Sequence, residues 1–282
     1  MRRPIILAVA ITLLVTGQLR AQCSDGGVCT LTSSSSQTAH ALTLGYGYGA
    51  SPSEDDLRFH SVRLASEIRL FEDSRVDIVL PFNAQSGPLG TVSGIGDLIM
   101  VWTQSISLAQ DASLEAQVGG RFRTADVNAG GLPQAYQSGL GTNDLLLGVG
   151  YSTGPLSAGF GYQLSRGRSA NAVTRLKRGD DVMVRASYSA SLGDLGLTGE
   201  VLGIKRLDLS SIRDSSAGAT ESFVTIPESD QLQINILAGV HYPISETLAL
   251  SLSSAIPLLK REINVDGLSR SFTISIGLRA EF

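Results

Sequence analysis

Charged side chains recur at alternate positions within apolar segments, and they are the residues of this sequence best suited to chemistry. Arg75 and Asp77 flank Val76, and Glu115 and Arg121 share one phase of a later segment. The planar fork of arginine pairs with carboxylates through two parallel hydrogen bonds and keeps its proton at any ordinary pH. Such an array suits the polar wall of a confined space, where it could fill an interior or select solutes by charge.

Catalytic and metal-binding patterns are weak by comparison. The three histidines, His40, His60 and His241, are isolated, and none has metal-ligand spacing or a clear serine and aspartate partner. The glycine-rich stretch 94–97 begins a predicted strand, and no helix follows to make a phosphate-binding loop. The sequence therefore predicts no catalytic residue, no metal site and no cofactor.

The elements that position these charges must be strands. The chain has 282 residues, of which 43% are hydrophobic and only 17% charged, against roughly 25% charged in ordinary soluble domains. After the first twenty residues no apolar run approaches the roughly 18 needed for a membrane-spanning helix. A net charge of −4 gives no basic field for nucleic acid. Two fold classes remain, a soluble β-sandwich or barrel and a transmembrane β-barrel.

Period-two alternation from about residue 40 onward decides between these two classes. We count twelve alternating segments, each of roughly the 9 to 11 residues that a tilted transmembrane strand needs, and about 10 to 14 strands would fit the pattern. Short turns alternate with long connections, as in outer-membrane barrels. The long connections are 49–56, 83–93, 124–142, 165–180, 206–230 and 257–270. The sequence thus predicts an all-β, antiparallel, up-and-down transmembrane barrel of twelve strands.

The cost of charge in lipid fixes which face points inward. An arginine or lysine on the lipid face near the midplane costs about 2 to 4 kcal/mol, so the charged positions should face the lumen and their apolar neighbours the lipid. The candidate lumen-lining residues are Arg63, Glu67, Arg69, Arg75, Asp77, Asp97, Glu115, Gln117, Arg121, Arg123, Asp144, Arg185, Glu200, Gln233 and Asn235.

The amino terminus has the pattern of a secretory signal peptide. Residues 1–21 combine an arginine pair, an apolar stretch and a small residue, Ala21, at the expected cleavage site. Export places Cys23 and Cys29 in an oxidising compartment, which predicts a disulfide, with a metal or redox pair as the alternative. We expect 22–39 to form a periplasmic segment and 40–282 the outer-membrane barrel.

The carboxyl terminus ends within the last predicted strand, on Phe282, with apolar residues at every second position back to Phe272. This pattern resembles the assembly signal of bacterial outer-membrane proteins, and the resemblance implies recognition by the barrel-assembly machinery during biogenesis. The expected partners are therefore this machinery, outer-membrane lipid and a small-molecule solute.

Two glycine-rich strand entries carry a second resemblance. Ser93-Gly94-Ile95-Gly96-Asp97-Leu98 precedes two strands and a long loop, which leads to Gly139-Leu140-Gly141-Thr142-Asn143-Asp144-Leu145 and then Gly148-Val149-Gly150-Tyr151. Over about residues 60 to 200 the chain resembles the outer-membrane family named for phenol meta-pathway degradation. It departs from that family at Arg123-Thr124-Ala125-Asp126, where members often have Pro-Thr-Gly. The resemblance implies a channel-like protein for small aromatic or hydrophobic compounds.

The expected function is a passive outer-membrane channel for small solutes, and the protein is not expected to be an enzyme. One alternative is a plugged structural or interaction barrel whose extracellular loops are the working surface. Another is an outer-membrane lipid hydrolase, for which His60 or His241 would need a serine at the same height on the outer wall.

Overall fold

The computed structural model describes residues 31, 40–52, 55–109, 111–216 and 221–282, and almost all of them lie in strands or their connections. The strands are β1 (Ala41–Ala50), β2 (Arg58–Phe71), β3 (Ser74–Gly87), β4 (Gly90–Ile95), β5 (Leu98–Ala109), β6 (Ala112–Phe122), β7 (Asn143–Thr153), β8 (Leu156–Arg166), β9 (Asp181–Leu192), β10 (Leu195–Arg206), β11 (Ser211–Arg213), β12 (Phe223–Thr225), β13 (Leu232–Pro243), β14 (Leu248–Leu259) and β15 (Phe272–Glu281). Two short 3-10 helices, η2 (Ala129–Gly131) and η3 (Gln134–Tyr136), lie between β6 and β7.

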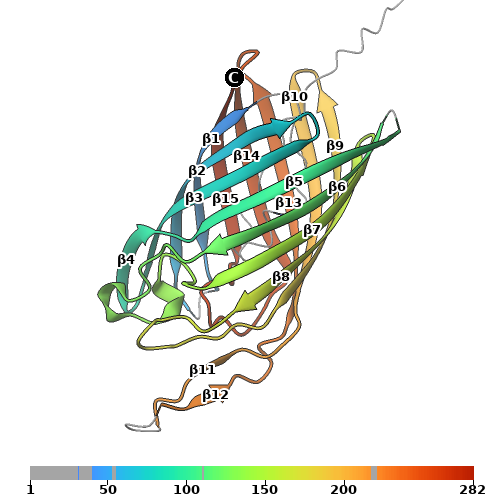
Figure 1. Cartoon of the computed structure of the whole chain (residues 1–282). Helices are drawn as coiled ribbons and strands as arrows, with labels where there is room; N and C mark the ends of the chain where they lie inside the picture. Colours follow the sequence, from blue (N-terminus) through green and yellow to red (C-terminus); the bar gives the residue numbers. More distant parts are fainter. Residues whose placement is uncertain (1–30, 32–39, 53–54, 110, 217–220) are drawn as a thin grey trace, which may run out of the picture.

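A single antiparallel sheet closes on itself to form the barrel (Figure 1). The sheet holds 13 strands, and because β4 is a side arm paired only to β3, twelve strands form the ring. The first and last strands pair along their whole lengths, from Ala41 opposite Glu281 to Ala50 opposite Phe272. Closure leaves no unpaired edge in the ring, as a sheet in lipid requires. The predicted twelve-stranded barrel is confirmed.

Two hairpins outside the ring were not predicted. Strand β3 continues to Gly87 and pairs with β4, a hairpin that covers the expected loop 83–93 and ends at Ile95. Strands β11 and β12 form a separate two-stranded sheet within the expected loop 206–230, and Figure 1 shows it projecting beyond the loop end of the barrel. These hairpins lie past the end of the membrane-spanning strands. There, neither face must be apolar, so the alternation that marks a membrane strand does not identify them.

The outer face of the barrel is a belt of exposed apolar side chains. Leu44, Val184 and Leu252 are each about half exposed, while the residues beside them in sequence point inward. Exposed aromatic residues mark both ends of the strands, for example Phe82 and Phe122 at the loop end and Phe71 and Tyr188 toward the short turns. Among the described residues, no helix is long and apolar enough to span a membrane. The apolar belt is the surface expected of a barrel whose outer wall contacts lipid.

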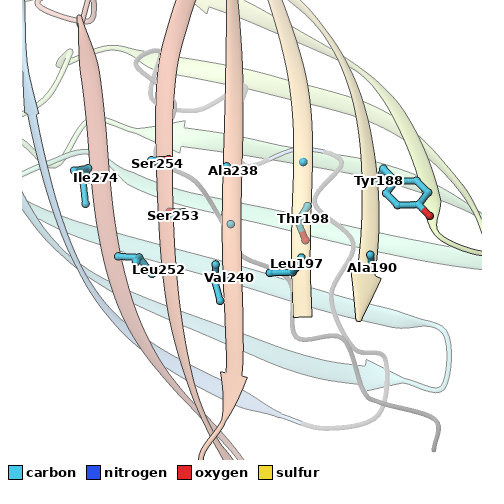
Figure 2. A pocket seen from close by; sticks show the side chains of 12 residues that line it. Tyr188, Ala190, Leu197, Thr198, Ala238, Val240, Leu252, Ser253, Ser254 and Ile274 are labelled. Carbon is cyan, nitrogen blue, oxygen red and sulfur yellow. The ribbon is translucent and has the colours of Figure 1, made fainter. Parts of the chain in front are cut away.

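A shallow hollow of about 450 Å³ interrupts this belt across β9, β10, β13, β14 and β15. Small residues, among them Gly199, Ala238 and Ser254, leave the space, and larger ones such as Tyr188 and Ile274 border it (Figure 2). No charged side chain lines the hollow. It belongs to the apolar outer surface and not to the charged interior.

Candidate functional site: the barrel interior

The interior is organised in three layers, which can be followed along single strands. On β10, the inward residues run from Arg206 at the loop end through Ile204 and Leu202 to Glu200. On β9, the inward Met183 likewise lies between two inward charged residues, Asp181 and Arg185. Charge therefore alternates with an apolar layer along the barrel axis. We call the layers the outer charge cluster, the apolar layer and the inner charge groups.

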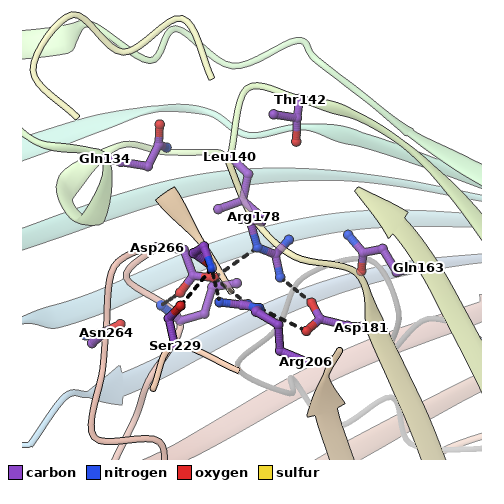
Figure 3. Close-up of polar contacts among 12 residues, drawn as sticks. Gln134, Leu140, Thr142, Gln163, Arg178, Asp181, Arg206, Ser229, Asn264 and Asp266 are labelled. Carbon is purple, nitrogen blue, oxygen red and sulfur yellow. Dashed lines mark hydrogen bonds and ion pairs between the residues drawn. The ribbon is translucent and has the colours of Figure 1, made fainter. Parts of the chain in front are cut away.

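The outer charge cluster joins two extracellular loops to the wall. Asp266, in the loop between β14 and β15, receives Arg206 Nη2 at 2.9 Å and Arg178 Nε at 3.0 Å. Asp181 receives Arg178 Nη2 at 2.6 Å and Arg206 Nε at 3.1 Å. Figure 3 shows these side chains converging from separate segments. The remaining members of the cluster are Asp97, Arg121, Asp144 and Arg261.

Asp266, which lies in a loop and not in a strand, is the central residue of this cluster. Its burial alone would raise its pKa, but the guanidinium groups of Arg206, Arg178 and Arg261 hold the pKa of this carboxyl well below its usual range. Asp266 is therefore ionised at any physiological pH. The cluster holds four arginines and four aspartates, so its formal charges balance.

Both glycine-rich motifs meet in the same cluster. Asp97, from the first motif, accepts hydrogen bonds from the backbone N–H groups of Leu140 and Gly141 in the second, at 2.7 and 2.9 Å. Arg121 pairs with Asp144 of the second motif and lies 3.9 Å from Asp97. Gly139 lets the loop approach, because a Cβ there would lie 2.9 Å from the carboxylate of Asp97. The two glycine-rich motifs thus attach the β6–β7 loop to the mouth of the barrel.

The apolar layer consists of buried residues that face inward from eight strands. Leu146, Met183, Leu202 and Ile204 have no accessible surface, and Val101 is 1% exposed. The other wall residues of the layer are Ala65, Val79, Ile99, Leu237 and Ala255.

Leu31 belongs to the same apolar cluster although it precedes the barrel in sequence. It is fully buried, and Arg185 Nη1 donates to its carbonyl oxygen at 3.3 Å. The segment 22–39 was expected to be periplasmic; its one described residue, Leu31, lies in the apolar layer inside the barrel. The other residues of the segment, the signal peptide 1–21 and the predicted disulfide of Cys23 and Cys29 lie outside the described residues.

The inner charge groups lie nearer the short turns. Arg279 makes a bidentate pair with Glu67, at 2.8 and 3.0 Å, although β1 separates their strands. Arg75 bridges Asp77 at 3.3 Å and Glu115 at 3.2 Å. A third pair joins Arg185 to Glu200 at 3.0 Å. Apart from Arg75 and Asp77, which share β3, these pairs link neighbouring or next-but-one strands along the wall.

Most of the predicted lumen residues lie in the interior. Buried members are Glu67, Arg75, Asp77, Asp97, Glu115, Gln117, Arg121, Asp144, Arg185, Gln233 and Asn235, and the half-buried ones are Arg63 and Glu200. Arg69 is half-buried at the rim, where it donates to the carbonyls of Phe71 and Glu72. Arg123 was predicted to line the lumen, and this is wrong. It lies beyond the end of β6, where the barrel wall no longer surrounds it, and it is exposed.

Sequence reasoning missed the loop residues Arg178, Arg261 and Asp266, the buried strand residues Asp181, Arg206 and Arg279, and the inward apolar residues. The loop charges gave no signal, because their partners are distant in sequence. The apolar layer left one, since Leu145, Leu146 and Leu147 form an unbroken apolar run where one residue must face the lumen.

The hydrolase alternative finds little support in the described residues. His60 faces outward, and its Nδ1 lies 2.8 Å from the hydroxyl of Tyr46, with the Tyr48 ring 5.1 Å away. No serine hydroxyl forms a hydrogen bond with a histidine in the part of the chain that the structure describes. The aromatic surroundings of His60 are therefore those of the outer rim and not of a nucleophile and base pair.

The fold and the interior together define an outer-membrane type of β-barrel with a charged and partly apolar lumen. No family model matches the chain, and no curated protein matches its sequence. Among solved structures, the chain is similar to an outer membrane channel from Pseudomonas putida F1, with a TM-score of 0.65 and 14% identity over 86% of this chain and 95% of that one.

Two further similarities are weaker. The NanC porin has a TM-score of 0.50 at 10% identity, covering 86% of this chain and 100% of that one. An outer membrane phospholipase from Salmonella typhi has a TM-score of 0.45 at 9% identity, over 85% and 90%, too low to bear on function. At these identities the comparisons establish the fold, that of an outer-membrane barrel.

Proposed function

We propose that the protein is a passive outer-membrane channel for small solutes, including aromatic and hydrophobic ones. The observation that carries this proposal is the apolar layer across the lumen. Val101, Met183, Leu202 and Leu237 belong to one buried apolar cluster between the charged groups of the interior, and their side chains have no polar group to replace the water of a hydrated ion. Hydrophobic constrictions oppose the passage of ions by dewetting. An uncharged aromatic solute meets a much smaller barrier there.

Two further observations support the proposal. The motif that resembles the phenol meta-pathway family builds the mouth of the barrel through Asp97 and Asp144. The similar structures with the two highest TM-scores above are, by their printed names, a channel and a porin. If the protein is instead a plugged structural barrel, the same closed mouth would support the extracellular loops as the working surface. Conductance separates the two functions.

A transport experiment tests the solute class. Cells that do or do not produce the protein in the outer membrane would be compared for accumulation of a radiolabelled neutral aromatic and of the corresponding aromatic carboxylate. We expect the protein to speed uptake of the neutral compound several-fold and that of the carboxylate little. Equal uptake with and without the protein would overturn the solute assignment.

A matched pair of variants tests the apolar layer itself. Leu237→Ser removes an inward apolar side chain, and Ile236→Ser removes its outward neighbour on β13. In planar bilayers we expect Leu237→Ser to raise the ion conductance several-fold, while Ile236→Ser conducts like the natural protein. If neither the natural protein nor Leu237→Ser conducts, the plugged-barrel alternative replaces the channel.

A further inference from the structure

The loop between β14 and β15, residues 260–271, crosses the extracellular mouth of the barrel, and we call it the lid. It leaves the wall at Leu259 and returns at Phe272. Between these points Asp266 reaches Arg178 and Arg206, which belong to the β8–β9 connection and to β10. Strands β10 and β14 are separated in the ring by β13. The lid therefore reaches from its own strands over the end of β13 to β10 and the β8–β9 connection.

The lid keeps its own shape through internal hydrogen bonds. The Asn264 side chain accepts from the backbone N–H of Ser269 at 3.0 Å, and the Ser269 hydroxyl donates to the carbonyl of Arg261 at 3.2 Å. Gly267, at φ +73°, permits close contact with the β6–β7 loop, since a Cβ there would lie 2.5 Å from the carbonyl oxygen of Ala135. A segment with internal bonds of this kind can move as a unit about its two ends.

Polar contacts hold this unit in place. Asp266 makes the two short ion pairs, and Arg261 lies 3.5 Å from Asp181. At the edge, Gln231 accepts from the backbone N–H of Glu262 at 2.6 Å, and the Asn264 amide donates to Asp55 at 2.8 Å. Charge-assisted hydrogen bonds are roughly twice as strong as neutral ones, so those of Asp266 are the strongest attachments of the lid.

We propose that the lid is a gate for the solute path, held closed by Asp266 between Arg178 and Arg206. This inference rests on the proposed channel function, because it states how passage through that channel is regulated. Opening requires Asp266 to leave both arginines together. In the open state, Asp266 and Arg261 both leave with the lid, so Arg178 and Arg206 remain paired with Asp181 at the mouth.

The variant Asp266→Asn tests the gate, because an amide of the same size cannot neutralise the arginines. Glu262→Gln makes the same change at an exposed position of the lid and serves as the matched control. We expect the open fraction in planar bilayers to rise by about tenfold or more in Asp266→Asn, the factor that the loss of even one charge-assisted hydrogen bond implies. Glu262→Gln should match the natural protein.

Hydrogen exchange of the lid gives a readout that does not depend on conductance. The backbone amide of Glu262 donates to Gln231 outside the lid, so it should exchange faster in Asp266→Asn than in Glu262→Gln. Heat-modifiable mobility on gels verifies that each variant has folded as a barrel.

A cross-link provides the reverse test. Cysteines replacing Asp55 and Asn264, in a background with Cys23→Ser and Cys29→Ser, would join the lid to the β1–β2 loop on oxidation. Combined with Asp266→Asn, oxidation should return the conductance to the closed level, and reduction should restore the increase.

The outcomes separate the gate from the channel. If Asp266→Asn changes neither exchange nor conductance while the natural protein conducts, the gate is overturned and the channel stands. If exchange in the lid accelerates but no variant conducts ions or takes up the neutral aromatic solute, the channel function is overturned, and the loop is only a polar cover. Faster exchange with raised conductance, reversed by the cross-link, supports the gate.

Discussion

Neutralising Glu67 should destabilise the barrel at the seam where its ends meet. The carboxylate of Glu67 on β2 receives both terminal nitrogens of Arg279 on β15, at 2.8 and 3.0 Å, across the intervening strand β1. Both residues are less than a tenth exposed. The pair therefore holds the first, second and last strands of the closed ring together from inside.

The magnitude follows from what remains after the change. Removing one partner of a buried ion pair costs roughly 3–5 kcal/mol, because the other charge stays buried without compensation. Arg279 keeps a second carboxylate, since its Nε lies 3.0 Å from Glu281. We therefore expect Glu67→Gln to lower the free energy of unfolding by about 3 kcal/mol, the lower end of that range.

Urea unfolding from lipid vesicles would measure this change. The chain has one tryptophan, Trp102, which lies on the outer face and is 40% exposed. Its fluorescence therefore reports transfer from lipid to water. Glu72→Gln, at an exposed turn position, is the control.

A double-mutant cycle isolates the pair itself. In Glu67→Gln combined with Arg279→Gln, no buried charge is stranded at this position, so part of the lost stability should return. The reasoning is wrong if Glu67→Gln unfolds like Glu72→Gln, or if the two seam substitutions add without coupling.

Three further predictions concern the lipid face, a loop glycine and pH. Leu147→Arg, on the outer face, should lower the free energy of unfolding by about 2–4 kcal/mol, whereas Leu156→Arg beside a short turn should cost about 0–1 kcal/mol; equal losses in the urea assay would contradict the assigned facing. Gly141→Ala and Gly154→Ala both place alanine at positive φ, +65° and +52°, at about 1–2 kcal/mol each, but only at Gly141 would the new Cβ meet a valine side chain, at 2.3 Å. Gly141→Ala should therefore lose about 1–3 kcal/mol more through overpacking and show faster proteolysis of the β6–β7 loop, and similar behaviour of the two variants would count against this close contact. Because the pKa of Asp266 is lowered in the fold, its contribution is complete above the pKa of a free aspartate, about 3.9, and is lost only as pH falls toward the lowered value. The fluorescence anisotropy of a dye on the lid should thus be the same at pH 7 and pH 5, and an increase in lid mobility at pH 5 would argue against this electrostatic assignment.

The sequence alone determined the barrel, its strand number and the facing of its walls. Lipid requires every second residue of a spanning strand to be apolar. This alternation can be seen directly in short stretches of sequence such as β9 and β15. The same rule placed Arg75, Asp77, Glu115 and Arg121 inside, because a charge in the lipid face is costly. Arg123 marks the limit of the rule, since alternation says nothing about where the wall ends.

Only the tertiary structure decided what occupies the lumen and its mouth. The ion pairs of Asp266 join segments about 60 to 90 residues apart in the chain, and loops carry no periodic signal that could bring them together. The apolar layer left only an ambiguous signal: on β7, an inward Leu146 between two outward leucines gives the same unbroken apolar run as any buried strand. Leu31 reaches that layer from outside the barrel sequence altogether. Local periodicity follows from the solvent on one face of a strand, whereas the closure of the lumen depends on contacts between residues distant in the chain.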